Sequence, residues 1–264
     1  MGLGKYRQEI EYFIGSTLVR AKGLKKESKD CLSNLKDKYK GQRCFVIGNG
    51  PSLTVEDLEN LKDEVTFASN GIYKIFAKTD WRPTYYAIFD EGVGKRKDIA
   101  ENASKLSCLK FFRQEGYLVY RKIAGPKCYI HSWYSRKYLD RPEFSENLLE
   151  GLYSIATVTY CMIQIARWMG FEEIYILGAD NRYAYSRLKD GTVVKNEGVA
   201  SYFSETGEKM PDPSSAVSTW EMDAAYEYAE KYSKEHGFRI YNATRGGFLE
   251  KFERVSLDEV LSKK

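Results

Sequence analysis

Residues 43–53, Arg-Cys-Phe-Val-Ile-Gly-Asn-Gly-Pro-Ser-Leu, are the stretch of this chain that says most about its architecture. The run from Cys44 to Ile47 is apolar, so it predicts a buried strand. Two glycines then let the backbone approach a ligand closely, and Ser52 or Thr54 can begin a helix whose free N–H groups attract phosphate. A strand, a glycine-rich turn and a helix in this order predict the first unit of an α/β sheet and a candidate phosphate loop.

The loop differs from the two common nucleotide-binding motifs. It is not GxGxxG, and no Gly-Lys-Ser or Gly-Lys-Thr follows it, so NAD binding and P-loop ATPase activity lose support. A plain turn into a capped helix explains the loop equally well. The candidate nucleotide-binding residues here are Gly48, Asn49, Gly50, Pro51 and Ser52.

The same alternation of short apolar runs and helical stretches continues along the chain. It predicts a doubly wound, mostly parallel α/β sheet of the Rossmann-like kind over residues 41–264. The predicted strands span 43–47, 64–68, 84–89, 173–177 and 238–241, with edge strands at 110–112 and 129–130; the predicted helices begin near Thr54 and span 154–169 and 220–235.

The composition fits one globular chain and limits its chemistry. With 43% hydrophobic residues in 264, disordered and fibrous classes are excluded. The net charge is only +4, and the Lys and Arg residues do not cluster in the sequence as a nucleic-acid interface needs, so we expect no nucleic-acid partner. Five scattered cysteines without CxxC predict no disulfide framework and no metal site, which is typical of a cytoplasmic protein. Because the chain has only two histidines, proton transfer must mostly use other groups.

Residues 1–40 predict an N-terminal helical extension. Ile10, Phe13 and Ile14 follow helical spacing between basic ends. The helix can pack on the domain or on a neighbouring subunit of a homo-oligomer, and it can also make peripheral contact with the inner face of a membrane. No apolar run approaches the ~20 residues of a membrane span, and no signal-peptide core is present.

Short polar side chains follow the predicted strands. In doubly wound sheets, ligands bind beyond the carboxyl ends of the strands, so these side chains predict a site. Asn70 can bind a ribose or phosphate oxygen, and Asp90 can bind ribose hydroxyls or Mg²⁺, although turns and helix caps use the same residue types. The residues at the strand ends are Asn49, Ser52, Asn70, Asp90, Asp180 and Asn242.

The second half of the chain adds candidates for holding an anion. Thr157 can offer its hydroxyl and the first amides of the long helix. Beyond Asp180, Arg182, Tyr183 and Tyr185 supply a cation and two phenols that suit phosphate oxygens. Residues 186–218 form a polar stretch with the length of a lid, with a mobile surface loop as the alternative.

The motifs FVIGNGPSL, SNGIY, YYAIFD, GFEEIYILGAD and RIYNAT, in this order, resemble the MptE-like family, named after archaeal 6-hydroxymethylpterin diphosphokinases. Over residues 41–255 they are also similar to the glycosyltransferase family 42 sialyltransferases. The sialyltransferases imply that Asn49, Gly50, Ser52 and Asn70 hold a CMP-sugar donor without a metal cofactor. They further imply that Thr157 lies near its phosphate or sugar, and that Tyr183 or Tyr185 assists departure of the phosphate.

The diphosphokinase resemblance implies different chemistry at the same site. It implies ATP, Mg²⁺ and acidic ligands such as Asp90 and Asp180. The bacterial members of the MptE-like group resemble proteins of cell-surface polysaccharide biosynthesis or flagellin glycosylation.

One position departs from the sialyltransferase pattern. Relatives carry a catalytic His in a Ser-His-Phe segment, whereas this chain has Ser201-Tyr202-Phe203. A tyrosine with an ordinary pKa of about 10 is a poor general base. Tyr202 therefore has another task, or Asp180, Glu197 or Glu205 takes the proton, or the acceptor needs no strong base. His131 and His236 are interpreted as structural residues.

The sequence thus supports the hypothesis of a nucleotide-dependent transferase with a lid. The first choice is a glycosyltransferase that moves a sugar from a CMP-type donor to a cell-surface glycan acceptor. The alternatives are a Mg²⁺-dependent diphosphokinase that uses ATP and a hydroxymethylpterin-like alcohol, and a non-catalytic nucleotide-binding module. The candidate catalytic residues are Asp180, Tyr183, Tyr185 and Tyr202.

Overall fold

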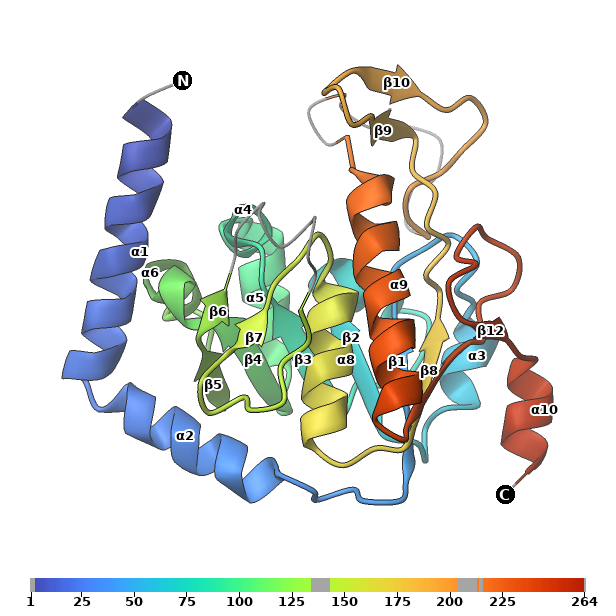
Figure 1. Ribbon diagram of the computed structural model, residues 1–264, viewed down its shortest axis with the longest axis horizontal. Coiled ribbons are helices and arrows are strands. Elements are labelled where there is room, and N and C mark those ends of the chain that lie inside the picture. Colours follow the sequence, from blue (N-terminus) through green and yellow to red (C-terminus); the bar gives the residue numbers. More distant parts are fainter. Residues whose placement is uncertain (1–2, 134–142, 204–212, 214–215, 264) are drawn as a thin grey trace.

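The computed structural model describes residues 3–133, 143–203, 213 and 216–263. Within them, one eight-stranded sheet forms the centre of the molecule (Figure 1). Its strands are β1 (Arg43–Ile47), β2 (Thr66–Ser69), β3 (Tyr85–Ile88), β4 (Leu109–Arg113), β5 (Lys127–Ile130), β8 (Glu173–Leu177), β11 (Arg239–Asn242) and β12 (Glu253–Arg254). They lie in the order β12-β11-β8-β1-β2-β3-β4-β5, and all neighbours run parallel.

Strand β1 is buried on both faces of the sheet. Cys44 and Val46 pack into the core on one face, and Phe45 and Ile47 pack into the core on the other. Because successive side chains of a strand point to opposite faces, only an apolar run on both sides fits this position. The predicted doubly wound α/β fold is confirmed.

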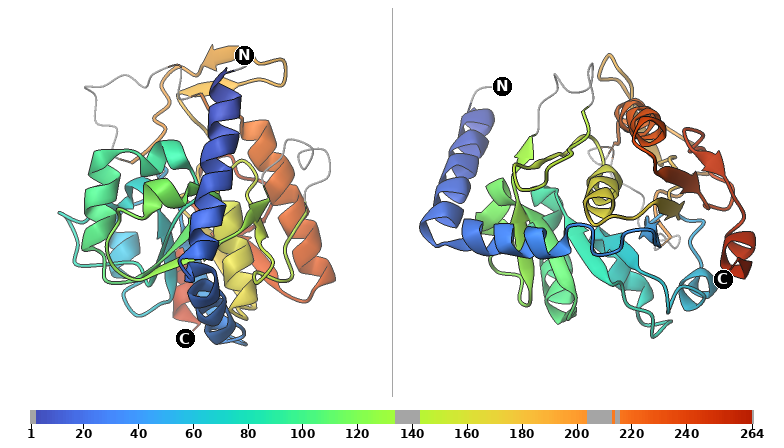
Figure 2. Two further views of the ribbon diagram at one scale, coloured as in Figure 1. Left: turned by 90° about the vertical axis from the view of Figure 1, so that its left-hand side faces the viewer. Right: turned by 60° about the horizontal axis from the view of Figure 1, so that its bottom comes forward.

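Helices cover both faces (Figures 1 and 2). The face of Cys44 is covered by α2 (Leu24–Leu35), α8 (Val158–Trp168) and α9 (Thr219–Glu235). The opposite face is covered by α3 (Val55–Glu59), η1 (Asn70–Ile75), α5 (Lys97–Lys105), α6 (Tyr117–Tyr120) and α10 (Leu257–Ser262). The remaining elements are α1 (Leu3–Ala21), α4 (Glu91–Gly94), η2 (Gln114–Gly116), β6 (Ser132–Trp133), β7 (Leu152–Tyr153), β9 (Tyr185–Arg187) and β10 (Val193–Lys195).

Two predicted elements differ from the structure. The strand predicted at the edge over 110–112 is β4, which lies inside the sheet between β3 and β5. The helix predicted from residue 154 begins only at Val158, because Leu152 and Tyr153 pair with β6 and Ala156 turns the chain with φ 54°. The helix predicted to begin near Thr54 is confirmed as α3, which Thr54 caps and which has five residues.

The N-terminal helices pack on the domain. Gly15 of α1 lies so close to the backbone carbonyl of Glu115 that any side chain there would collide with it, and Val19 is fully buried. The opposite side of α1 leaves Ile10, Phe13 and Ile14 exposed. In the described part of the chain, no helix has both the length and the apolar character needed to span a membrane.

The chain changes direction at β1. From β1 it proceeds outward through β2, β3, β4 and β5, and then returns to place β8 on the other side of β1. Ligands of doubly wound sheets bind where the strand order reverses, so the carboxyl ends of β1 and β8 mark the expected site.

Candidate functional site

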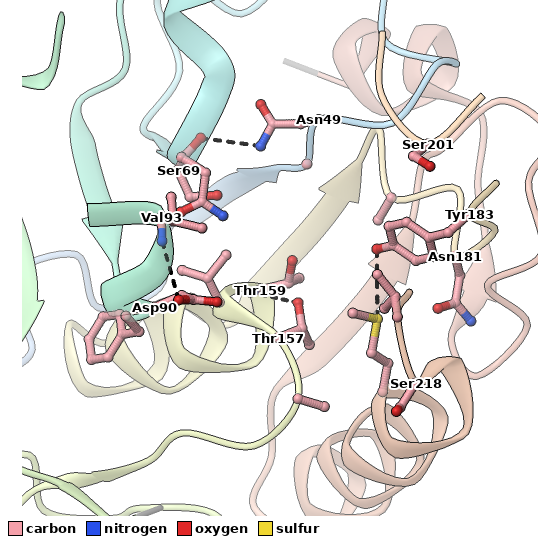
Figure 3. A pocket seen from close by; sticks show the side chains of 18 of the residues that line it. Asn49, Ser69, Asp90, Val93, Thr157, Thr159, Asn181, Tyr183, Ser201 and Ser218 are labelled. Atoms are coloured by element: carbon pink, nitrogen blue, oxygen red, sulfur yellow. Dashed lines mark hydrogen bonds between the residues drawn. The ribbon is translucent and has the colours of Figure 1, made fainter. Parts of the chain in front are cut away.

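A cavity of about 560 Å³ lies at the carboxyl ends of β1, β2, β3 and β8 (Figure 3). Its volume is within the range of small-molecule sites. It brings together most of the residues that the sequence singled out. The predicted residues that line it are Gly48, Asn49, Gly50, Asn70, Asp90, Thr157, Asp180, Arg182, Tyr183 and Tyr202.

Other predicted residues do not line this cavity. Ser52 points to Asp180, and Pro51 is exposed. Tyr185 begins β9, where its backbone carbonyl accepts a hydrogen bond from Val217. Asn242 is buried and donates to the backbone carbonyl of Leu249 at 2.7 Å. Glu197 lies outside the lining, and Glu205 falls outside the described residues.

The two glycines of the first loop allow two protein loops to touch. A Cβ on Gly48 would collide with the carbonyl of Gly178, and a Cβ on Gly50 would collide with the carboxylate of Asp180. The Gly50 amide donates to the Gly178 carbonyl at 2.8 Å. The sequence predicted that these glycines allow the close approach of a ligand, and both of them line the cavity. The structure shows in addition that they allow the loops after β1 and β8 to touch.

The predicted phosphate site at the start of α3 is closed by the protein itself. The Thr54 hydroxyl accepts from the Asp57 amide at 3.2 Å, and the Asp57 carboxylate accepts from the Thr54 amide at 2.9 Å. This capping box satisfies N–H groups that would otherwise be free for an anion. The buried Asp57 also pairs with Arg245.

The helix whose amino end faces the cavity is α8. Thr157 caps it, accepting from the Thr159 amide at 3.2 Å, and residues 157–159 line the cavity (Figure 3). The amino end of an eleven-residue helix carries partial positive charge, so this wall favours an anion.

Strained backbone is concentrated at this site. Asn70, Ala156 and Asn181 line the cavity and have φ values of 50°, 54° and 54°. Apart from Asp37, no other non-glycine residue in the described ranges has a positive φ. For alanine this conformation costs about 1–2 kcal/mol, and such strain is typical of functional sites.

Three asparagine amides present buried oxygens without a partner among the described residues: those of Asn49, Asn70 and Asn181. Asn49 donates its NH₂ group to the backbone carbonyl of Ser69 at 3.2 Å, and Asn181 donates to the Asp223 carboxylate at 2.7 Å. A buried oxygen without a hydrogen bond costs about 1–3 kcal/mol. The cavity is thus lined with amide groups able to recognise a polar ligand.

The two predicted carboxylates are partly committed to the protein. Asp90 caps α4 and accepts from the amides of Gly92 and Val93 at 2.7 and 3.3 Å. Asp180 accepts from the Ser52 hydroxyl at 2.7 Å. In the part of the chain that the structure describes, no three His, Cys, Asp or Glu side chains gather closely enough to hold a metal ion.

Phenols form the wall next to Asp180. The rings of Tyr183 and Tyr202 meet edge-on with centroids 6.2 Å apart, and the Tyr183 hydroxyl donates to Met222 Sδ at 3.7 Å. Burial raises the pKa of Tyr183 well above its ordinary value, and the neighbouring Tyr226 adds to this. Tyr183 therefore remains a neutral hydrogen-bond donor at any ordinary pH.

Sequence reasoning missed several lining residues. Arg113 is 6% exposed, ends β4, and has its guanidinium 4.5 Å from the ring of Tyr12 of α1. Glu91 is also buried, and burial raises the pKa of its carboxyl. Arg113 follows the same strand-end rule as Asn70, so that rule finds it once β4 is recognised as an inner strand.

The neighbouring segment, residues 186–203, is tied to this site. The Ser201 hydroxyl accepts from the Ala184 amide at 2.9 Å, and the Phe203 amide donates to the Asn49 carbonyl at 3.0 Å. Tyr202, between them, is 43% exposed and lines the cavity.

One solved structure shows that this fold occurs in a glycosyltransferase. The MAf glycosyltransferase from Magnetospirillum magneticum AMB-1 is 18% identical with a TM-score of 0.54, over 89% of this chain and 39% of that protein. This chain therefore matches only about two fifths of that protein's length. The sialyltransferase CstII from Campylobacter jejuni, solved with the substrate analogue cytidine-5'-monophosphate, is 17% identical with a TM-score of 0.42, over 82% of this chain and 86% of that protein.

No curated protein matches this chain. A family model described as 6-hydroxymethylpterin diphosphokinase MptE-like matches residues 20–186. This match covers more than half of the chain and confirms the resemblance of its motifs. The chain belongs to the MptE-like family.

Proposed function

We propose that this protein is a nucleotide-dependent glycosyltransferase that moves a sugar from a CMP-type donor to a glycan acceptor. The observation that carries the proposal is the set of amides at the strand ends. Asn49, Asn70 and Asn181 bring both donor and acceptor groups into one cavity, and their oxygens lack protein partners among the described residues. A pyrimidine base and a ribose need such paired donors and acceptors.

The remaining walls suit the phosphate and its departure. Thr157 and the amino end of α8 favour the charge of the donor phosphate. The neutral phenol of Tyr183 can donate to the phosphate oxygen as negative charge develops on it. In the transfer, the acceptor oxygen bonds to the anomeric carbon, and the bond from that carbon to the phosphate oxygen breaks with its electron pair leaving on CMP. The acceptor proton passes to a carboxylate of the site or to water.

The segment of residues 186–203 is proposed as part of a lid over this reaction. Its hydrogen bond from Phe203 to Asn49 joins it to the nucleotide-binding loop. Excluding water in this way favours transfer over hydrolysis. We place the reaction in the cytoplasm, with the acceptor at the inner face of the membrane.

The family model favours one second candidate, a diphosphokinase that uses ATP and a hydroxymethylpterin-like alcohol. Asp90 accepts through one carboxylate oxygen from the amides of Gly92 and Val93, and Asp180 accepts through one oxygen from Ser52. Among the described residues, no hydrogen-bond donor engages the second oxygen of either side chain. Mg²⁺ usually needs one or two carboxylates in addition to nucleotide phosphates, so either residue could supply a ligand to an ion that arrives with ATP. The ion would neutralise phosphate charge.

A thermal-shift panel separates the candidates. CMP, CDP, UDP, GDP and ATP are tested with and without Mg²⁺, because a bound ligand raises the unfolding temperature. We expect CMP to stabilise the protein without Mg²⁺ and Asn49→Ala to abolish the shift. Asn60→Ala, at an exposed amide, is the matched control.

Each alternative has its own outcome in the same experiments. Stabilisation by ATP only with Mg²⁺, together with ATP consumption on addition of a hydroxymethylpterin, would favour the diphosphokinase. Binding of CMP without turnover of any CMP-sugar indicates a non-catalytic module. Failure of all five nucleotides to bind contradicts the three hypotheses together.

A further inference from the structure

We infer that the outer face of α1 and the turn into α2 bind the surface of an anionic lipid bilayer. The apolar part of this surface is Ile10, Phe13 and Ile14, which are 58%, 75% and 41% exposed. Their spacing of three and four residues places them on one side of the helix. This side faces away from the domain.

The opposite side of α1 packs on the domain, so the helix cannot rotate to bury its apolar side. Gly15 packs on the backbone of Glu115, Val19 is fully buried, and Tyr12 lies against Arg113. Figure 2 (left) shows α1 and the start of α2 as the foremost elements of this side of the molecule. The helix is therefore presented lengthwise, as an interfacial helix lies on a membrane.

The charge of residues 10–40 favours an anionic partner. Residues 10–40, the N-terminal arm, contain eight Lys or Arg and four Asp or Glu, an excess of +4 that equals the net charge of the whole chain. One of these acids, Glu11, is paired with Lys95 of the domain. Arg20, Lys22 and Lys26 are exposed around the end of α1 and the start of α2. Basic residues beside an apolar helix face match an anionic membrane surface.

The same charge disfavours a second copy of this chain as the occupant. A symmetric contact through Phe13 would bring two segments of excess +4 together over only three exposed apolar side chains. Repulsion between like charges opposes that contact, whereas anionic headgroups neutralise the same residues. We therefore commit to the lipid surface.

Binding of α1 to a bilayer also indicates which acceptor the cavity serves, and this step rests on the proposed function. Tyr12 on the inner side of α1 lines the cavity together with Arg113. A bilayer bound to the outer side holds the cavity close to the membrane surface. The acceptor class that fits this arrangement is a lipid-borne glycan.

Vesicle flotation of the full chain tests the inference. Vesicles of equal parts phosphatidylcholine and phosphatidylglycerol are expected to bind the protein, and vesicles of phosphatidylcholine alone are not. Raising salt from about 0.1 M to about 0.5 M should release it, because screening shortens the reach of the charges. The variant Phe13→Ser should lower the partition coefficient about tenfold.

Matched variants give the experiment its controls. Phe248→Ser removes a phenylalanine that is 56% exposed elsewhere and should leave vesicle binding unchanged. Lys22→Gln, Lys26→Gln and Lys29→Gln together should weaken binding about fivefold for each lysine. Lys78→Gln, Lys105→Gln and Lys231→Gln remove the same charge from other exposed sites and should have little effect.

The inference is overturned if the protein does not bind the anionic vesicles, or if the control variants lose as much vesicle binding as the variants of α1 and α2. It is also overturned if Phe13→Ser converts a dimer into a monomer in sedimentation while vesicle binding is unchanged, because the face is then a self-association surface. CMP binding measured without vesicles reports on the proposed function separately, and Phe13→Ser should not alter it.

Discussion

The Ser52 hydroxyl donates a 2.7 Å hydrogen bond to the Asp180 carboxylate, and this bond joins the loop after β1 to the loop after β8. The Ser52 amide approaches the same oxygen at 3.3 Å. Two residues assigned from the sequence to nucleotide binding and to catalysis are therefore one structural pair. Ser52 positions Asp180, which lines the cavity, while Ser52 does not.

Replacing Ser52 with Ala should destabilise the protein through Asp180. The carboxylate oxygen loses its shorter donor, and hydrogen bonds to charged groups contribute about 1.5–3 kcal/mol. We expect a decrease of about 2 kcal/mol in the free energy of unfolding, measured by urea denaturation. Ser52→Thr keeps the hydroxyl and should recover most of the loss. Equal loss in both variants would contradict the assigned role.

Because of the backbone conformation of Asn70, substitution by Gly and by Ala together tests nucleotide binding more sharply than the alanine substitution alone. At φ 50°, glycine fits without strain, whereas alanine costs about 1 kcal/mol. Both Asn70→Gly and Asn70→Ala remove the amide, so both should lose the CMP-induced thermal shift. Only Asn70→Ala should also lower the unfolding temperature of the free protein. A normal CMP shift in Asn70→Gly would remove this residue from the site.

The buried Glu91 carboxyl predicts a pH-dependent stability. Because burial raises its pKa, the folded protein holds this proton more tightly than the unfolded chain does. The free energy of unfolding therefore falls as pH rises from the ordinary value of 4.5 through the raised value. Glu91→Gln cannot ionise, so its unfolding temperature should exceed that of the wild type by about 2 °C or more at neutral pH.

The comparison at lower pH and at another glutamate controls this prediction. The advantage of Glu91→Gln should shrink as pH is lowered toward 4.5, because the raised pKa lets the folded wild type take up its proton over this range. Glu235→Gln, at an exposed position of α9, should show no such change. Differential scanning fluorimetry over this pH range measures both, and a pH-independent difference for Glu91→Gln would refute the assignment.

The sequence was sufficient for the sheet because Cys44–Ile47 and Ile174–Leu177 are apolar on both faces, and only an inner strand has two buried faces. Two-residue strands such as β12 could not be predicted, since no periodicity exists over so short a run. The strand-end rule found Asn70 and Asp90. It missed Arg113, whose strand was assigned to the edge.

Ala156 could not be found by any sequence rule. Its left-handed conformation has no signal in the residue type, because alanine rarely adopts it. The conformation is set by the turn between β7 and the capped start of α8. Likewise, the collision that requires glycine at position 50 involves Asp180, which is distant in sequence.

Tyr183 and Tyr185 form a matched pair for testing the leaving-group donor. Tyr183 lines the cavity, and the only hydrogen bond described for its hydroxyl is the weak one to Met222 Sδ. Tyr183→Phe should therefore keep the stability and lower kcat about 10²-fold with little change in KM. Tyr185→Phe, outside the lining, should keep its kcat. Because the pKa of Tyr183 is raised well above 10, its contribution should not vary with pH between 6 and 9. A kcat for Tyr183→Phe equal to that of Tyr185→Phe would refute the assignment.

Tyr202→His tests which group takes the acceptor proton. Tyr202 is 43% exposed, so histidine should be accommodated with a change in unfolding free energy of about 0.5 kcal/mol or less. An imidazole with an ordinary pKa of about 6.5 is a far better base at neutral pH than a phenol. If the site lacks a strong base, kcat should rise about tenfold or more and should gain a titration near pH 6.5. Tyr202→Phe, which offers no base, should remain close to the wild type. A large loss of kcat in Tyr202→Phe, with no gain in Tyr202→His, would instead show that the Tyr202 hydroxyl itself takes part in the transfer.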